Sequence, residues 1–305
     1  MVSPRPVRLQ IPASTSNVGP GFDAFSIALD MAIEVRWEAA EADSLERTGG
    51  LAESPLSRVQ DPLTRGMRRA ARLAGKELPT GKVTVSASFP PGRGLGASGS
   101  GLVAGLMLGN RLTGGKLEDK DLLDEAIQME GNPENAVGAM LGGAHWSIRL
   151  ESGRWRHVPV QLHNRLRFLL VVPPYPLDTR RSREALPSSV AVGRAIRQAQ
   201  RTPVLLEGLR ELDPELIRVG VQDELHVAPR LRLMAGGQAM VDFAMEAGAL
   251  GATLSGAGSA LLVLTRTGEM RDLEARLRKR VDRLWGADGT VLSARVQPKG
   301  ASFLR

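Results

Sequence analysis

Apolar residues recur along the chain in two distinct spacings. Two-residue alternation, or a short apolar run between turn residues, is typical of strands, whereas spacings of three and four are typical of helices. Residues 38–56 are polar and weakly patterned, which predicts turns. Strands are predicted at residues 7–11, 25–37, 83–89, 145–150, 167–172, 252–254, 260–264 and 290–297. Helices are predicted at residues 63–73, 102–112, 119–130, 136–141, 182–200, 202–210, 238–247 and 270–284.

The order of these elements bears on the fold class. Strands and helices follow one another irregularly, without a repeated βαβ unit, which favours α+β over a doubly wound sheet. The chain has 305 residues, and about 100–200 residues per domain is usual. Because the composition changes near residues 152–165, we expect two lobes, 1–155 and 156–305.

Composition excludes several kinds of chemistry. The chain has no cysteine, so disulfides, thiol nucleophiles and cysteine-ligated zinc are excluded. Its four histidines are scattered without metal-ligand spacing. The first residues lack the apolar core of a signal peptide, and glycines interrupt the uncharged runs 94–110 and 247–265. We therefore expect a cytoplasmic protein that does not enter a membrane.

The net charge excludes fewer kinds of binding partner than the composition does. Forty Lys and Arg against 33 Asp and Glu give a net charge of +7, compatible with phosphate-bearing substrates. Nucleic-acid binding is not expected, because aromatic residues make up only 4% of the chain.

One glycine-rich segment carries the strongest local signal. Residues 90–100, PPGRGLGASGS, lie between a predicted strand and a predicted helix. Glycines let backbone N–H groups approach an anion closely, and the start of a helix adds partial positive charge. The segment lacks the Gly-Lys-Ser/Thr of a Walker A loop and the βαβ setting of a dinucleotide fold. It is a candidate phosphate cradle; taken alone, it fits a glycine-rich turn with close helix packing equally well.

Two further glycine-rich segments favour the phosphate cradle over a simple turn. PASTSNVGPGFD (12–23) and LSGAGSA (254–260) each join predicted strands through glycines. Together the three segments resemble the signature of the superfamily of galactokinase, homoserine kinase, mevalonate kinase and phosphomevalonate kinase, the GHMP kinases. The first segment looks like the homoserine kinase form. EGNPEN (130–135), TRRSREALP (179–187) and DELHVAPR (223–230) resemble further motifs of that branch.

The resemblance, which spans residues 7–264, implies a fold and a reaction. The fold would be two-lobed α+β, with an N-terminal lobe like ribosomal protein S5 and a ferredoxin-like C-terminal lobe. The reaction would be ATP- and Mg²⁺-dependent phosphorylation of L-homoserine to O-phospho-L-homoserine, a step of threonine biosynthesis. The resemblance also leaves a homodimer open.

The same resemblance implies roles for individual residues. Asn135 would bind the homoserine hydroxyl, Asp23 with Asn17 the amino group, and Arg183 with Arg230 the carboxylate. Ser98 and Glu130 would hold Mg²⁺, and Asp23 would be the base only if it lay nearer the hydroxyl than the amine. Asn132, Thr179, Gly256 and Gly258 would border the substrate. The ATP phosphates would be wrapped by Pro90, Pro91, Gly92, Arg93, Gly94, Leu95, Gly96, Ala97, Ser98, Gly99 and Ser100.

Several positions depart from the family pattern. Ala97 replaces a serine of the phosphate loop and Gly99 an alanine, while Asn132 replaces a histidine expected beside the substrate. Ser259 replaces a proline, and Pro62 stands where an adenine-contacting asparagine is usual, which leaves the choice of base open. Because Ser98 and Glu130 are retained, we expect a working enzyme.

Other interpretations stay open at this point. Glu130 and Asn135 could cap helices, Asp23 could form a turn, and either arginine could be a surface residue. The acceptor could instead be shikimate or an isoprenoid alcohol, or the chain could be a non-catalytic, ligand-binding descendant of the fold. The paired arginines favour a carboxylated substrate.

Overall fold

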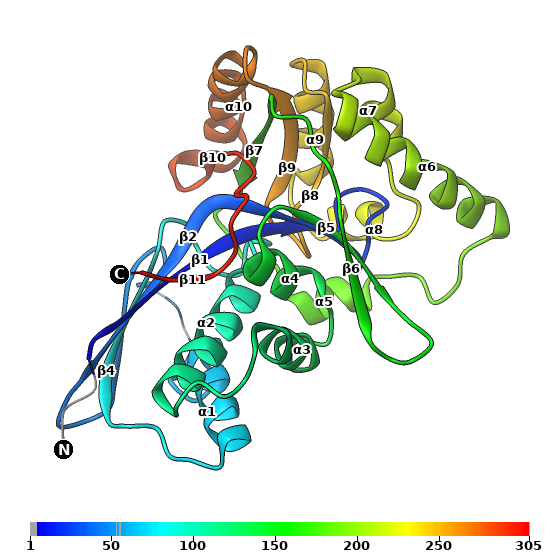
Figure 1. Ribbon diagram of the computed structural model, residues 1–305. Coiled ribbons are helices and arrows are strands. Elements are labelled where there is room, and N and C mark those ends of the chain that lie inside the picture. The colour runs from blue at the N-terminus through cyan, green and yellow to red at the C-terminus, as the bar shows by residue number, and fades with distance from the viewer. Residues whose placement is uncertain (1–4, 53, 55, 305) are drawn as a thin grey trace.

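The computed structural model describes residues 5–52, 54 and 56–304, and within this part of the chain it contains two sheets (Figure 1). The seven-stranded sheet runs in the order β11-β1-β2-β4-β3, with β5 paired to β2 and β6 to β5. The four-stranded sheet runs β10-β7-β9-β8. All described pairs are antiparallel except β3 with β4. The strands are β1 (Val7–Ser16), β2 (Phe25–Ala39), β3 (Ser44–Gly49), β4 (Gly81–Ala87), β5 (Ala144–Arg149), β6 (Trp155–Pro159), β7 (Leu166–Val172), β8 (Gly251–Leu254), β9 (Leu261–Arg266), β10 (Thr290–Ala294) and β11 (Ser302–Leu304).

Recognisable capping residues set the ends of the helices that reach the candidate site. At the start of α1, the Asp61 carboxylate accepts hydrogen bonds from two backbone N–H groups and Pro62 occupies the first turn; the helix ends at Gly75. Helix α3 ends at Gly131 in the left-handed conformation. The helices are α1 (Pro62–Ala74), α2 (Ala97–Leu112), α3 (Asp119–Glu130), α4 (Glu134–Leu141), α5 (Thr179–Glu184), α6 (Val192–Glu211), α7 (Pro214–Gly220), α8 (Val227–Leu231), α9 (Gly237–Glu246) and α10 (Met270–Trp285), followed by the 3₁₀ turn η1 (Gly286–Asp288).

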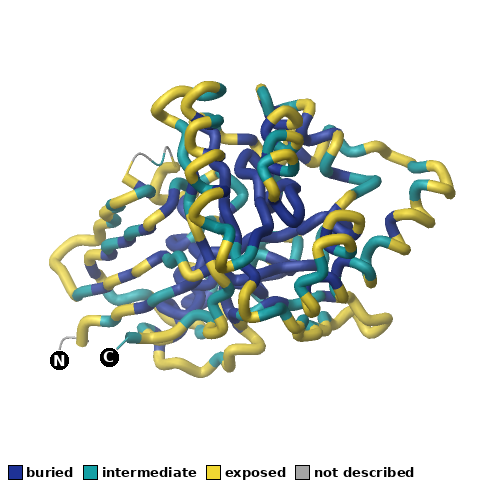
Figure 2. Tube along the Cα trace, turned by 90° about the horizontal axis from the view of Figure 1, so that it is seen from above, coloured by how far each residue is buried: buried dark blue, intermediate teal, exposed yellow. Residues whose placement is uncertain are grey.

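One apolar cluster spans both lobes, and a second lies within the C-terminal lobe. Figure 1 shows α1 to α4 on one side of the long strands β1 and β2, with the second sheet and its helices on the other side. Along β7, Phe168 and Leu170 join the same apolar cluster as β1 and α2, while Leu169 and Val171 pack toward α9 and α10. The second sheet is thus covered on both faces, which explains the apolar runs FLLVV in β7 and LLVL in β9. Figure 2 shows the buried trace running through the middle of the molecule.

The α+β fold class is confirmed, and three strands were missed by the sequence prediction. Strand β3 lies in the stretch 38–56 that was predicted as turns; its sequence SLERTG has a single large apolar residue, because it lies at an edge of the sheet. Residues 53 and 55 of that stretch lie outside the described residues. Strands β6 and β11 join the first sheet, although β6 crosses the lobe boundary expected at 155/156 and β11 lies beyond it.

The helix predicted at 182–200 was wrong. Helix α5 ends at Glu184, and α6 begins only at Val192, because Pro187 disfavours helical backbone at the residue before it. Conversely, α6 runs without a break to Glu211 and contains Pro203, although the sequence analysis had predicted two helices that separate at residue 201. The last strand, predicted to end at 297, ends at Ala294. The chain then returns to the first sheet, where Val296 bridges to Leu29 and β11 pairs with β1.

No helix in the described residues is both long and apolar enough to cross a membrane. The expectation about a leader falls in part on residues 1–4, which lie outside the described residues.

Candidate active site

The three glycine-rich segments meet and hydrogen-bond to one another. Ser14 N donates to Leu95 O at 3.2 Å, and Gly256 N donates to Ser16 O at 2.9 Å. The Ser255 hydroxyl donates to Gly94 O at 2.6 Å. Gly94 has φ of +73°, and a Cβ there would lie 2.0 Å from Ser255 O, so only glycine fits this contact. The segments predicted to act together therefore form one structural unit.

A polar cleft of about 300 Å³ opens at this junction. Its lining draws on every motif that the sequence singled out: the first segment, the glycine loop, the end of α3, the start of α4, α5, α8 and the third segment. The predicted residues that line it are Asn17, Gly92, Gly94, Leu95, Gly96, Ala97, Ser98, Glu130, Asn132, Asn135, Thr179, Arg183, Arg230, Gly256 and Gly258.

A second, mostly apolar hollow of about 230 Å³ lies on the other side of the loop. It shares Gly92, Ala97 and Ser98 with the cleft. Its remaining lining includes Pro62, which begins α1, and the apolar side chains Ile33, Leu51, Leu56, Leu63 and Val85. An apolar hollow joined to a polar cleft by a glycine loop suits a molecule with a flat apolar ring at one end and phosphates at the other.

The start of α2 provides the anion-binding groups. Gly96 is its N-cap in the left-handed conformation and contributes no side chain to cap the helix. The backbone N–H groups of Ala97, Ser98 and Gly99 therefore lie in the first turn, where helices leave N–H groups without intrahelical partners. Such groups, together with the helix dipole, attract phosphate. Replacement of a serine by Ala97 does not remove this backbone contribution.

Not every residue of the predicted phosphate loop lines the cleft. The Arg93 guanidinium donates to Pro174 O at 3.1 Å, and the buried Ser100 hydroxyl donates to Pro12 O at 2.8 Å. Pro91 lines the apolar hollow instead, and Pro90 is in neither lining. Arg93 and Ser100 thus fasten the loop to its surroundings, although Arg93 Nε is buried without a hydrogen-bond partner among the described residues.

Gly99 is explained by a close approach of helices. A Cβ at this position would lie 2.7 Å from both Glu130 Oε2 and Asn135 Cβ. An alanine, the residue usual in the family, would force one of these side chains away.

We therefore expect Gly99→Ala to destabilise the protein and to lower turnover. Overpacking costs about 1–3 kcal/mol, against a gain of about 0.5–1 kcal/mol in helix propensity. Urea unfolding and steady-state kinetics measure the two effects. Gly193→Ala is the matched control, because a Cβ there meets nothing closer than 3.8 Å. Equal stability and turnover in the Gly99 variant and the native protein would show that Glu130 and Asn135 leave room for a Cβ at this position.

Glu130 ends α3 beside the loop. Its Oε2 is buried and has no hydrogen-bond partner among the described residues. Burial raises the pKa of its carboxyl to about 8, with a further increase from the charge of Glu134, while the Ser98 hydroxyl and the charge of Arg65 act in the opposite direction. A buried carboxylate oxygen without a partner, close to a hydroxyl, fits a hard cation that also binds phosphate oxygens. In the described chain no group of three or more acidic or histidine side chains is placed to hold a metal.

Glu134 is a site residue that the sequence analysis did not assign. It lies in the EGNPEN segment, is only 3% exposed and lines the cleft. Burial raises the pKa of its carboxyl to about 7, and the charge of Asp23 raises it further, whereas Arg183 and Arg230 lower it. Its position in the motif, directly before Asn135, could have identified Glu134 as a site residue from the sequence.

Asp23 and Arg183 form a two-pronged ion pair. Arg183 Nη1 donates to Asp23 Oδ2 at 3.0 Å and Nη2 to Asp23 Oδ1 at 2.9 Å. Asn17 holds Asp23 in turn, because its side-chain oxygen accepts from Asp23 N at 2.8 Å. In the amide orientation that satisfies both polar atoms of Asn132, its nitrogen donates to Gly131 O at 3.0 Å and its oxygen accepts from Arg183 Nη2 at 2.8 Å. Asp23 itself is not in the lining of the cleft, but its partner Arg183 is.

Arg230 is held far more deeply. It is 1% exposed, its Nε donates to Ser182 O at 3.3 Å and its Nη1 lies 3.2 Å from His226 Nδ1. His226 Nε2 lies 2.9 Å from Gly19 O. Because a carbonyl only accepts, Nε2 carries the proton and Nδ1 accepts from Arg230. Burial lowers the pKa of Arg230 to about 10, so the guanidinium remains charged at neutral pH.

An aromatic ring joins the two arginines. Phe22 stacks on His226 with a centroid distance of 4.8 Å. The guanidinium carbons of Arg230 and Arg183 lie 5.0 and 5.5 Å from the Phe22 centroid. Both cations are therefore fixed over one ring from segments far apart in the sequence.

Asn135 and Thr179 complete the acceptor end. Asn135 Oδ1 accepts from the Ser14 hydroxyl at 3.3 Å, which leaves the amide N–H groups as donors. Thr179 begins α5 and lines the cleft beside Gly256 and Gly258. The alternative view of Asn135 as a helix cap is not supported, because Pro133 is the N-cap of α4 and Asn135 lies inside the helix.

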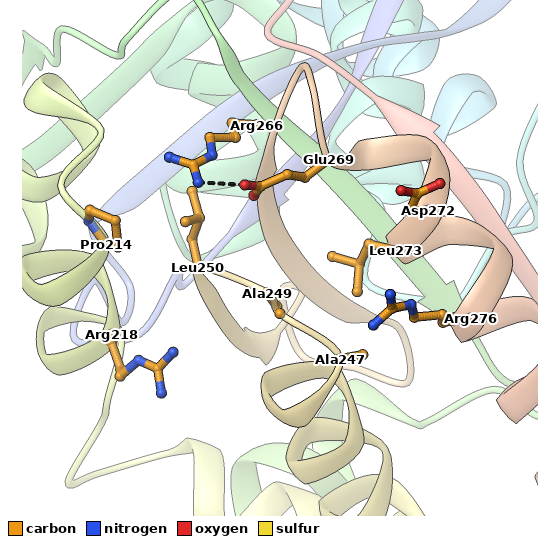
Figure 3. A pocket seen from close by; sticks show the side chains of 11 residues that line it. Pro214, Arg218, Ala247, Ala249, Leu250, Arg266, Glu269, Asp272, Leu273 and Arg276 are labelled. Atoms are coloured by element: carbon orange, nitrogen blue, oxygen red, sulfur yellow. Dashed lines mark hydrogen bonds and ion pairs between the residues drawn. The ribbon is translucent and has the colours of Figure 1, made fainter.

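Another hollow lies against the second sheet, between α7 and α10 (Figure 3). Its lining includes the ion pair of Arg266 with Glu269, and Leu250 and Leu273 at its base. It receives no residue from the three glycine segments, so it is not the candidate active site.

Comparisons with known proteins agree with this geometry. Residues 63–143 match the family described as GHMP kinases N terminal domain, and residues 183–283 match GHMP kinases C terminal. A homoserine kinase of Synechococcus sp. (strain WH7803) is 36% identical over 263 residues, covering 85% of this chain and 83% of that protein. A homoserine kinase of Prochlorococcus marinus (strain MIT 9312) is 31% identical and covers 97% of this chain and 95% of its own length.

Solved structures show the same architecture. The crystal structure of homoserine kinase from Cytophaga hutchinsonii superposes with a TM-score of 0.82 at 24% identity, covering 100% of this chain and 99% of that one. A putative homoserine kinase from Listeria monocytogenes has a TM-score of 0.78 at 26% identity, covering 98% and 99%.

Proposed function

The chain belongs to the GHMP kinases and, among them, to the homoserine kinases, and we propose that it phosphorylates L-homoserine with ATP. The oxygen of the homoserine hydroxyl forms a bond to the γ-phosphorus, and the bond from that phosphorus to the β,γ-bridging oxygen breaks. The hydroxyl proton is released, and the products are O-phospho-L-homoserine and ADP.

The observation that carries the choice of acceptor is the Asp23–Arg183 pair at the wall of the cleft. An amino acid carries an ammonium and a carboxylate on one carbon, and so can exchange with this pair. Its carboxylate takes the place of Asp23 on the guanidinium, and its ammonium takes the place of Arg183 on the carboxylate. No charge is left without a partner, which avoids the large cost of an unpaired charge.

The other proposed contacts follow from the same pose. Arg183 and Arg230 grip the carboxylate, and Asp23 with Asn17 holds the amino group. The Asn135 amide N–H groups then meet the hydroxyl, with Thr179, Asn132, Gly256 and Gly258 around it. In this pose the Asp23 carboxylate is engaged by the substrate ammonium and is poorly placed to take the hydroxyl proton, so we assign Asp23 to the amino group and name no general base.

Phosphoryl transfer depends on in-line positioning and on neutralising charge on the phosphate oxygens. The uncapped start of α2 and the glycine loop supply N–H donors for the phosphates. Ser98 and the unpartnered Glu130 Oε2 fit a Mg²⁺ ion, which when bound neutralises charge on the β- and γ-phosphates. Pro62 and the apolar side chains near it would receive the base.

An omission assay tests this proposal. ADP release should require L-homoserine, ATP and Mg²⁺ together, and phosphorus NMR should identify a phosphate monoester of homoserine. Equal ATP turnover with and without homoserine would contradict the proposal. Ligand binding without ADP formation would support the non-catalytic alternative.

The alternative acceptors do not match the Asp23–Arg183 pair. Shikimate and isoprenoid alcohols lack an ammonium group to exchange for Arg183 on Asp23, so these acceptors are not favoured. A cytoplasmic location and a homodimer stay predictions.

A further inference from the structure

Arg65 is a cleft residue that the sequence motifs do not include. It lies in the first turns of α1, is exposed, and lines the cleft together with Gly96, Ala97, Ser98 and Glu130. The first two residues of α1, Pro62 and Leu63, line the apolar hollow. Arg65 therefore lies on the nucleotide side of the cleft, between the proposed base and metal positions.

The cations of the cleft have different partners. Its described lining contains three guanidiniums and no lysine. Arg183 is paired with Asp23, and Arg230 is bonded to Ser182 and His226. The side chain of Arg65 forms no hydrogen bond or ion pair with any described residue, although the nearby Arg69 pairs with Glu125 at 2.7 Å. Arg65 is thus the cleft cation that remains available to an anionic ligand.

Charge and chemistry at this position indicate a phosphate. Arg65 lines the cleft with Ala97 and Ser98 at the start of α2 and with Glu130 at the end of α3. A guanidinium can donate two parallel hydrogen bonds to phosphate oxygens.

We propose that Arg65 binds the polyphosphate chain of ATP. This inference rests on the proposed function, because it takes ATP as the donor. The side chain is exposed and unpartnered before the nucleotide enters, so binding breaks no ion pair. Its role is contact with the nucleotide phosphates, distinct from the carboxylate clamp at the other end of the cleft.

Calorimetric titration of Arg65→Ala with ATP, ADP and adenosine tests this role. Titrations in excess EDTA and again with Mg²⁺ separate a phosphate contact from an effect through Glu130. We expect ATP to bind at least about tenfold more weakly in both conditions, equal to about 1.4 kcal/mol. Adenosine affinity should be unchanged, and Arg65→Lys should recover part of the loss.

Arg68→Ala is the matched control. Arg68 is an exposed arginine three residues along α1 and is not in the lining of the cleft. Its loss should leave ATP affinity unchanged. Melting temperatures of all three variants should match the native protein, because Arg65 has no described partner.

Three outcomes would overturn the inference. Unchanged ATP affinity in Arg65→Ala would exclude a phosphate contact. An equal loss for adenosine would place Arg65 at the base, and a loss that appears only with Mg²⁺ would mean that it acts through Glu130. If native protein binds ATP but fails to phosphorylate homoserine, the proposed acceptor fails while the Arg65 test stands. If native protein binds no ATP, both fail.

Discussion

Glu130→Gln is expected to lower kcat by about 10²-fold or more, the scale for losing one group that stabilises transition-state charge. A neutral amide is a poor ligand for Mg²⁺ compared with a carboxylate. Steady-state kinetics over a range of Mg²⁺ concentrations measure the effect. An unchanged maximal rate and Mg²⁺ dependence would show that Glu130 only supports the end of α3.

The same substitution should stabilise the protein in alkaline solution. The folded pKa of Glu130 is raised to about 8 from an ordinary value of 4.5. The buried neutral carboxyl therefore contributes stability that is fully present below pH 4.5. That stability is lost as the pH rises through 8, because the folded protein must then hold a buried carboxylate charge. Glutamine removes that charge. We expect Glu130→Gln to melt near the native temperature at pH 5 and above it at pH 8.5. A lower melting temperature at pH 8.5 would mean that the carboxylate is stabilised by the protein.

Arg183→Lys and Arg230→Lys are each expected to lower kcat/KM for homoserine by about 10- to 150-fold. This corresponds to about 1.5–3 kcal/mol, the scale of a hydrogen bond to a charged group. Lysine keeps the charge but loses the planar fork that matches a carboxylate. ATP affinity should barely change. Arg230, at 1% exposed, is not a surface residue. Unchanged kcat/KM for homoserine in either lysine variant would contradict the role of that arginine in holding the carboxylate.

A substrate without the carboxylate provides the control. 3-Aminopropan-1-ol has the hydroxyl and the amine, so the loss should largely vanish for it. A double-mutant cycle between each arginine and the substrate carboxylate separates the contact from structural damage. This matters for Arg230, which is bonded to Ser182 and His226. Equal losses with homoserine and 3-aminopropan-1-ol would exclude the clamp.

The sequence pattern predicted elements whose ends are marked by their own residues, and missed strands that depend on a partner elsewhere in the chain. Helix α3 has the bounds that the sequence predicted, because its apolar spacing lies within the helix and Gly131 caps its end. Strand β11 has three residues, and its partner β1 begins near the other end of the chain. No local pattern specifies such a pairing. Likewise the polar edge strand β3 is ordered by pairing with β4, so its own sequence indicates turns.

The candidate site shows a similar division. Motif resemblance identified Asp23 and Arg183, but only the structure shows that they bind each other. Glu134 lay within a quoted motif and was passed over for its neighbour Asn135. Arg65 had no motif signal, because it is an ordinary exposed position of an amphipathic helix until α1 is placed against the cleft.

The most direct test of the account is kcat/KM for a panel of acceptors at fixed ATP and Mg²⁺. The panel contains L-homoserine, L-serine, shikimate, mevalonate and 3-aminopropan-1-ol, with ADP release as the readout. The paired charges at Asp23 and Arg183 predict that L-homoserine is preferred over every other member, with 3-aminopropan-1-ol weakened by loss of its carboxylate. Shikimate or mevalonate turning over as well as homoserine would contradict the assignment of this cleft to an amino acid.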